Sequence, residues 1–170
     1  MKKLQFLKTL VDLFWYFSII AIIAMTLFIP YLFFSKEVID IPIVINGQKI
    51  LVTDLSTKFL LLVAVIAYFL FAYGIFLFRK VLMSFQKRAI FSDEVIVLLD
   101  KVGKSFLLSS ILTACVLLVY NFTPTSNISI EFGGGFSSFL FTASLGLFFM
   151  VLSEVFKISK TMKDESDLIV

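Results

Sequence analysis

The chain has 170 residues, of which 60% are hydrophobic and only 16% are charged, and 22 are phenylalanine. Soluble domains average about 45–50% apolar and about 25% charged residues, so this composition excludes an ordinary soluble globule and indicates a small integral membrane protein. The chain contains no histidine and a single cysteine, Cys115. Imidazole chemistry, an internal disulfide and a thiolate zinc site are therefore excluded, and we expect Cys115 to be a small buried hydrophobic residue.

Four apolar stretches are long enough to cross a membrane, because a helix needs roughly 20 mostly apolar residues to span a hydrocarbon core of about 30 Å. They cover residues 10–34, 57–79, 104–121 and 136–157. The first stretch is longer than the roughly 7–15-residue core of a signal peptide, so we expect an uncleaved span. The sequence predicts an all-α membrane protein in which residues 1–170 form a single four-transmembrane-helix bundle.

The distribution of basic residues predicts the orientation of the bundle. Twelve of the fifteen lysines and arginines lie in the N-terminal tail, the segment between spans two and three, and the C-terminal tail. The other three are Lys36, Lys49 and Lys58. Under the positive-inside rule both termini are cytoplasmic, and the expected location is the bacterial inner membrane.

Two loops on the predicted outer side have strand patterns. In residues 41–52, two β-branched runs flank Asn46-Gly47, a dipeptide typical of a type I′ hairpin turn. Residues 127–132 alternate polar and apolar side chains, which predicts one more strand. Because a lone hairpin is marginally stable, we expect the hairpin and this strand to form an extracytoplasmic β-sheet cap. The glycines at 133–135 would join the cap to the last span.

An amphipathic helix is predicted for residues 92–103 on the cytoplasmic side. Ser92 is a good N-cap, and Asp93 and Glu94 place negative charge at the positive end of the helix dipole. Apolar residues then recur at helical spacing. We expect this helix to lie at the membrane interface and to bend at Gly103 into the third span.

Small residues recur every four positions on the last two spans, which predicts that these spans pack against each other through the two stripes. The stripes are Ser105, Ser109 and Thr113 on the third span and Ser138, Thr142 and Gly146 on the fourth.

Two acidic residues, Asp12 and Glu154, lie near the cytoplasmic ends of their spans. An ionisable group in a span is a functional candidate by default, but at these positions a structural ion pair is the simpler interpretation. For Glu154 the candidate partners are Lys157, Arg79 and Lys104.

No paired carboxylates, nucleophile elbow, phosphate loop or metal-ligand cluster is present in the sequence. We therefore expect a protein that is not an enzyme and uses no cofactor or metal ion. The net charge of +3 follows from the positive-inside bias, so we expect lipid rather than nucleic acid as the direct partner.

Two cytoplasmic segments resemble a known family. The first is Phe-Ser-Asp-Glu at 91–94, followed by Leu-Leu-Asp-Lys-Val-Gly at 98–103. The second is Leu-Ser-Glu-Val-Phe at 152–156, followed by Lys-Asp-Glu-Ser-Asp-Leu-Ile-Val at 163–170. Both resemble an uncharacterised bacterial family of four-span proteins called domain of unknown function 2975. Ser153 and Ser166 stand where the family commonly has Ala and Asn.

The resemblance implies no established reaction. Genes of this family often lie beside a small helix-turn-helix regulator of the phage-repressor type, which implies a membrane-bound signalling or regulatory adaptor that engages this regulator through its cytoplasmic face. The alternative is a small oligomeric transport, export or self-immunity protein. The predicted partner-docking residues are Phe91, Asp93, Glu94, Gly103, Glu154, Asp164, Glu165, Asp167 and Leu168.

Overall fold

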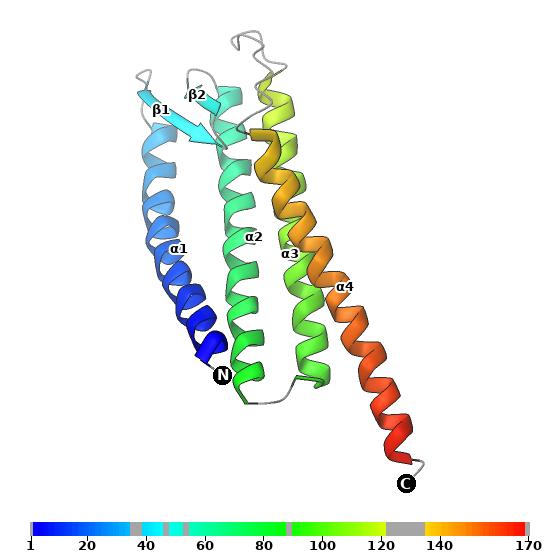
Figure 1. Ribbon diagram of the computed structural model, residues 1–170. Coiled ribbons are helices and arrows are strands. Elements are labelled where there is room, and N and C mark those ends of the chain that lie inside the picture. The colour runs from blue at the N-terminus through cyan, green and yellow to red at the C-terminus, as the bar shows by residue number, and fades with distance from the viewer. Residues whose placement is uncertain are drawn as a thin grey trace.

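The computed structural model describes residues 2–34, 39–45, 48–52, 55–87, 90–121 and 135–168. Within these ranges the chain forms helix α1 (Lys2–Phe34), strands β1 (Ile39–Ile45) and β2 (Gln48–Val52), and helices α2 (Leu55–Gln86), α3 (Asp93–Asn121) and α4 (Gly135–Leu168). The helices run side by side along one axis, and the hairpin lies at the end of the bundle away from both termini (Figure 1).

All four helices are long enough and apolar enough to cross a membrane. This confirms the predicted four-span helical bundle. Each helix has between 29 and 34 residues, whereas about 20 residues span the hydrocarbon core. The helices therefore continue beyond the hydrocarbon at one end or both.

Strands β1 and β2 pair antiparallel, as the Asn46-Gly47 signal predicts. Ile45 lies opposite Gln48 and Ile43 opposite Ile50, and the register shifts between Ile39 and Ile43. The turn at 46–47, the predicted third strand at 127–132 and the glycines at 133 and 134 lie outside the described residues. The hairpin is thus present, whereas the three-stranded cap stays a prediction.

The core lies where α2, α3 and α4 meet. The ring of Phe149 on α4 lies 4.9 Å from that of Phe78 on α2 and 6.0 Å from that of Phe106 on α3, between ring centroids. Phe106 in turn lies 5.3 Å from Phe71 on α2. Because these large apolar rings contact one another across three helices, they fix the helices' mutual positions.

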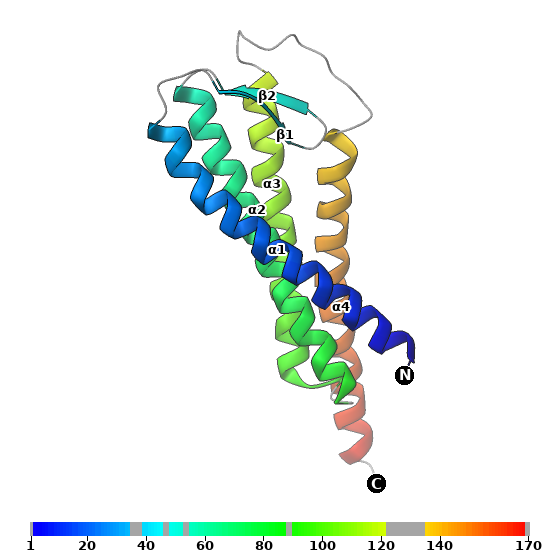
Figure 2. The same cartoon turned by 90° about the vertical axis from the view of Figure 1, so that its left-hand side faces the viewer.

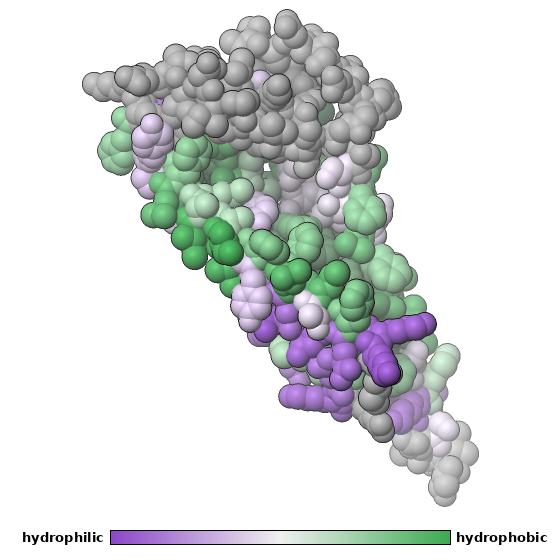
Figure 3. All heavy atoms as spheres, turned by 60° about the vertical axis from the view of Figure 1, so that its left-hand side comes forward, coloured by the Kyte–Doolittle hydropathy of each residue, from purple (hydrophilic) through white to green (hydrophobic). Residues whose placement is uncertain are grey.

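Helix α1 packs mainly on α2 and leaves most of its apolar side chains on the surface. Figure 2 shows α1 crossing the bundle obliquely. On the face drawn in Figure 3, apolar side chains cover the middle of the bundle and hydrophilic side chains gather toward the end that carries the termini. This apolar belt is the surface that lipid would cover.

Helices α3 and α4 pack against each other as predicted, and Gly146 of the predicted stripe on α4 forms the contact, whereas Ser105 and Ser109 of the predicted stripe on α3 bond to α2. Gly103 and Gly146 face each other so closely that a Cβ on Gly103 would lie 2.6 Å from the carbonyl oxygen of Gly146. The hydroxyls of Ser105 and Ser109 instead donate to carbonyl oxygens of Leu70 and Ala67 on α2, both over 2.7 Å. The serines therefore join α3 to α2, and the glycines join α3 to α4.

The predicted bend at Gly103 is wrong, and so is the separate interfacial helix at 92–103. Helix α3 runs without interruption from Asp93 to Asn121. The apolar face that we assigned to lipid, formed by Val95, Leu99 and Val102, is completely buried against the other helices. Its amphipathic pattern arises because one side of α3 packs in the bundle while the other faces outward.

The prediction for Cys115 is also wrong, because its side chain is exposed on α3. Composition gives no information on which side of a membrane-spanning helix faces lipid, since both sides are apolar.

Candidate functional site

The N-terminus, the α2–α3 connection and the C-terminal part of α4 lie at the same end of the bundle, which we call the termini end (Figure 1). The family-like segments at 91–94 and 152–156 also come together there, since α3 begins next to α4. The candidate site therefore consists of the start of α3 and the last turns of α4.

Ser92 caps the start of α3, which confirms the predicted helix start. The amide of Val95 donates to the Ser92 carbonyl oxygen over 3.0 Å and faces its Oγ at 3.4 Å. Asp93 and Glu94 occupy the first turn, and both are exposed. Their carboxylates stabilise the helix through its dipole.

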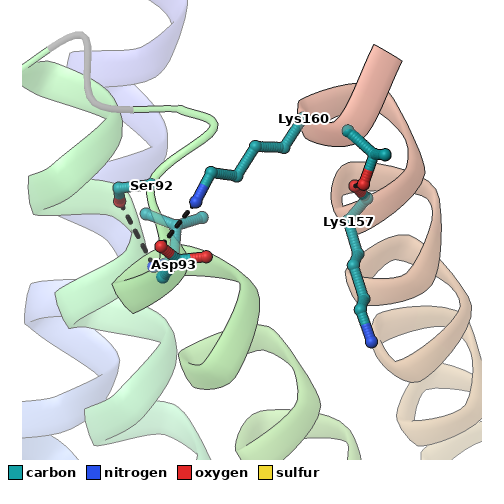
Figure 4. Close-up of polar contacts among 6 residues, drawn as sticks. Ser92, Asp93, Lys157 and Lys160 are labelled. Atoms are coloured by element: carbon teal, nitrogen blue, oxygen red, sulfur yellow. Dashed lines mark hydrogen bonds and ion pairs between the residues drawn. The ribbon is translucent and has the colours of Figure 1, made fainter. Parts of the chain in front are cut away.

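Two polar contacts join α4 to the start of α3. The Nζ atom of Lys160 lies 2.5 Å from Oδ2 of Asp93, and Ser153 Oγ donates to the Ile96 carbonyl oxygen over 2.7 Å. In Figure 4 Lys160 reaches across to Asp93, while Lys157 points along α4 instead. Asp93 is therefore engaged within the molecule, although its side chain remains largely exposed.

Three phenylalanines pack beside these contacts. The ring of Phe156 on α4 lies 5.6 Å from Phe91, just before α3, and 6.0 Å from Phe85 at the end of α2. Phe91 nevertheless remains 43% exposed. The cluster thus packs α2, the α2–α3 connection and α4 together and still leaves one aromatic ring at the surface.

The structure separates the predicted docking residues into accessible and inaccessible ones. Glu94, Glu154, Asp164 and Glu165 are exposed. Gly103 is buried against α4, so its assignment to a docking surface is wrong. The reason is that a glycine in a helix can serve a close approach as well as a bend, and the sequence does not distinguish the two.

Asp167 and Leu168 belong to the last turn of α4. Their side chains lie outside the described residues, as do residues 169 and 170.

Two of the three partners considered for Glu154 are engaged elsewhere. Arg79 pairs with Asp12 and Lys104 pairs with Asp100. The Glu154 side chain is exposed.

The Asp12–Arg79 pair joins α1 to α2. It confirms the structural ion pair expected at Asp12, but Arg79 was predicted only as a candidate partner of Glu154. Arg79 Nε donates to Asp12 Oδ1 over 2.5 Å, and the side chains are 26% and 24% exposed respectively. The signal was available, because both residues lie near the cytoplasmic ends of predicted spans. The sequence alone does not show that α1 lies beside α2, however, so Arg79 could be paired with either Asp12 or Glu154.

Within the described ranges, no group of three or more cysteine, aspartate or glutamate side chains is arranged to hold a metal ion. The carboxylates of Asp164 and Glu165 are exposed near the end of α4.

A family model described as "Protein of unknown function (DUF2975)" matches residues 12–170. The chain belongs to this family. The match covers all four membrane-spanning helices and the whole termini end apart from the first residues of α1. Comparisons with curated proteins and with solved structures found no match.

Membership of the DUF2975 family agrees with a multi-pass membrane protein and assigns no reaction to it.

Proposed function

We propose that the protein is a non-enzymatic signalling or regulatory adaptor of the bacterial inner membrane. Its termini end faces the cytoplasm and binds a small helix-turn-helix transcription regulator. Twelve of the fifteen basic residues lie in segments at this end, and the positive-inside rule supports a cytoplasmic location for them.

The observation that carries the proposal is the length of α4. Lys160 is level with Asp93, the first residue of α3, because the two side chains bond. Helix α4 continues for eight more residues to Leu168, which is about 12 Å at 1.5 Å per residue. Figure 1 shows this segment extending beyond the ends of the other helices.

The chemistry of this extension suits a soluble protein partner. Asp164 and Glu165 are exposed near its end, beyond the basic residues that would lie close to lipid headgroups. A DNA-binding regulator carries basic side chains that neutralise phosphates. Acidic side chains on α4 complement such a surface, so binding to the membrane protein would compete with binding to DNA.

The test is co-purification from detergent-solubilised membranes of the full-length protein, co-expressed with the product of the neighbouring gene, which the family resemblance implies to be a helix-turn-helix regulator. We expect the wild-type protein to retain the regulator and the double variant Asp164→Lys/Glu165→Lys to retain at least about tenfold less, as expected for reversing charges at a steered interface. The matched control, Lys101→Glu, changes an exposed charge on α3 away from the α4 extension and should retain the regulator normally. Equal retention by the charge-reversed and wild-type proteins, or no retention by either, would contradict the proposal.

A further inference from the structure

Helix α4 carries a stripe of exposed apolar residues with heptad spacing. Its members follow one another at alternating intervals of three and four residues, and each is between 48% and 64% exposed. They are Phe148, Val151, Val155, Ile158 and Met162. This is the a/d spacing by which one helix packs along another.

The stripe lies on the side of α4 opposite to the rest of the bundle. The side that contacts α3 also repeats every seven residues, through Gly146, Ser153 and Lys160. At 100° per residue these three positions lie about 170° from the middle of the stripe. No contact within the described bundle can therefore cover it.

Lipid can cover only part of this stripe. About 20 residues from the start of α4 at Gly135 lead to Glu154, the first charged residue of the helix. Met162 lies eight residues further on, about 12 Å along the helix axis. The headgroup region adds only about 5–8 Å on each side of the hydrocarbon, so Met162 extends past it.

The composition of the stripe changes where lipid ends. Before Glu154, exposed apolar residues of α4 also lie outside the stripe, such as Leu147. After Glu154, the exposed apolar side chains that the structure describes, up to residue 166, are limited to the stripe, and the residues flanking it are polar, namely Ser159 and Thr161. A narrow apolar seam with polar flanks is the pattern of a helix–helix contact in water.

We propose that the stripe from Phe148 to Met162 pairs with the same stripe of a second copy of this chain, as a parallel helix dimer. A single binding partner has to cover this stripe, which begins in the hydrocarbon and ends in water. A second α4 does so, because both copies insert in the same direction and their stripes match residue for residue about a two-fold axis along the membrane normal.

The charges of α4 are compatible with this pairing. In a parallel dimer identical residues meet, so a charged seam would repel itself. Beyond Glu154 the lysines lie outside the seam, and Lys160 is engaged with Asp93 on the opposite side. The next seam position after Met162 is Glu165, where the pairing would end. The proposal does not depend on the regulator discussed above.

Cysteine cross-linking of the full-length protein in bacterial membranes tests the pairing. In a Cys115→Ala background, single substitutions Val155→Cys, Ile158→Cys and Met162→Cys place thiols on the seam. Lys157→Cys and Lys163→Cys place them on exposed positions away from it. A disulfide joins residues whose Cα atoms are about 4.4–6.8 Å apart. Identical stripe residues that face each other in a parallel helix pair lie within this distance.

After oxidation with copper phenanthroline, we expect a species of twice the 19.3 kDa chain at the seam positions and at least about tenfold less at the two control positions. Equal cross-linking at seam and control positions, no dimer at any position, or an adduct of another mass would overturn the proposal.

A second test measures the mass of the assembled protein and uses no introduced cysteines, so any effect of those cysteines on folding or pairing is avoided. The purified protein in lipid nanodiscs wide enough for two copies should have the mass of a dimer. Ile158→Glu/Met162→Glu should shift it to a monomer, whereas Lys157→Glu/Lys163→Glu should not. A monomeric wild-type protein, or a dimer that persists in the seam variant, would overturn the pairing.

Discussion

Asp12 and Arg79 form an ion pair that is mostly withdrawn from water, near one end of two helices that also contact each other through the rings of Trp15 and Phe76. Removing one partner of such a pair leaves a charge without compensation, whereas removing both leaves none. Because α1 has few other interhelical contacts, this pair contributes to the placement of the whole first helix.

We predict that Asp12→Ala and Arg79→Ala each lower the free energy of unfolding by about 1–3 kcal/mol and that the double variant loses less than the sum, with a coupling of about 1 kcal/mol. Unfolding by SDS in mixed micelles measures all three variants. The matched control is the more exposed pair Asp100–Lys104 on α3, for which we expect a smaller coupling. Strictly additive losses for Asp12 and Arg79 would show that the pair does not stabilise the protein.

The sequence predicts the structural role of some residues and not of others. The cap at Ser92 follows from its immediate neighbours, so the local pattern was sufficient. The roles of Gly103, Cys115 and Ser109 depend on which helix lies opposite, and this the sequence alone does not define.

At the scale of elements, α3 is the helix on which the packing depends. One of its sides bonds to α2 through serine hydroxyls, and another approaches α4 at glycine. The close approach allows backbone contacts that larger residues would prevent. The four helices could be predicted from composition, and the helical state of residues 92–103 from their cap and apolar spacing, but their continuity with the third span could not, because the sequence does not show whether Gly103 bends the helix.

We predict that Gly103→Ala and Gly146→Ala each destabilise the protein by about 1–3 kcal/mol, because the added methyl group meets backbone atoms of the facing helix and, at position 103, also the Met150 side chain. Thermal unfolding of the purified variants measures the effect. Cys115→Val adds bulk to an exposed position of the same helix and serves as the control, with little expected change. Unchanged stability of both glycine variants would mean that α3 and α4 are not held as closely as described.

At the scale of the whole molecule, the chain separates into a hairpin end, an apolar belt and a termini end that carries most of the basic residues. The belt and the number of helices follow from composition and length. Among the residues predicted to dock a partner, Glu94, Glu154, Asp164 and Glu165 are accessible and Gly103 is buried, while the docking itself stays a prediction. The apolar stripe of α4 was not predicted, since inside a span it resembles any lipid-facing surface.

The proposed adaptor role depends on one claim, that the termini end faces the cytoplasm. A membrane-impermeant maleimide applied to intact spheroplasts tests it, with single cysteines introduced by Lys49→Cys on β2 and Glu165→Cys on α4 in a Cys115→Ala background. We predict that the cysteine at position 49 is labelled in intact spheroplasts and that the cysteine at position 165 is labelled only after the membrane is permeabilised. Labelling of position 165 in intact spheroplasts, with position 49 protected, would contradict the account.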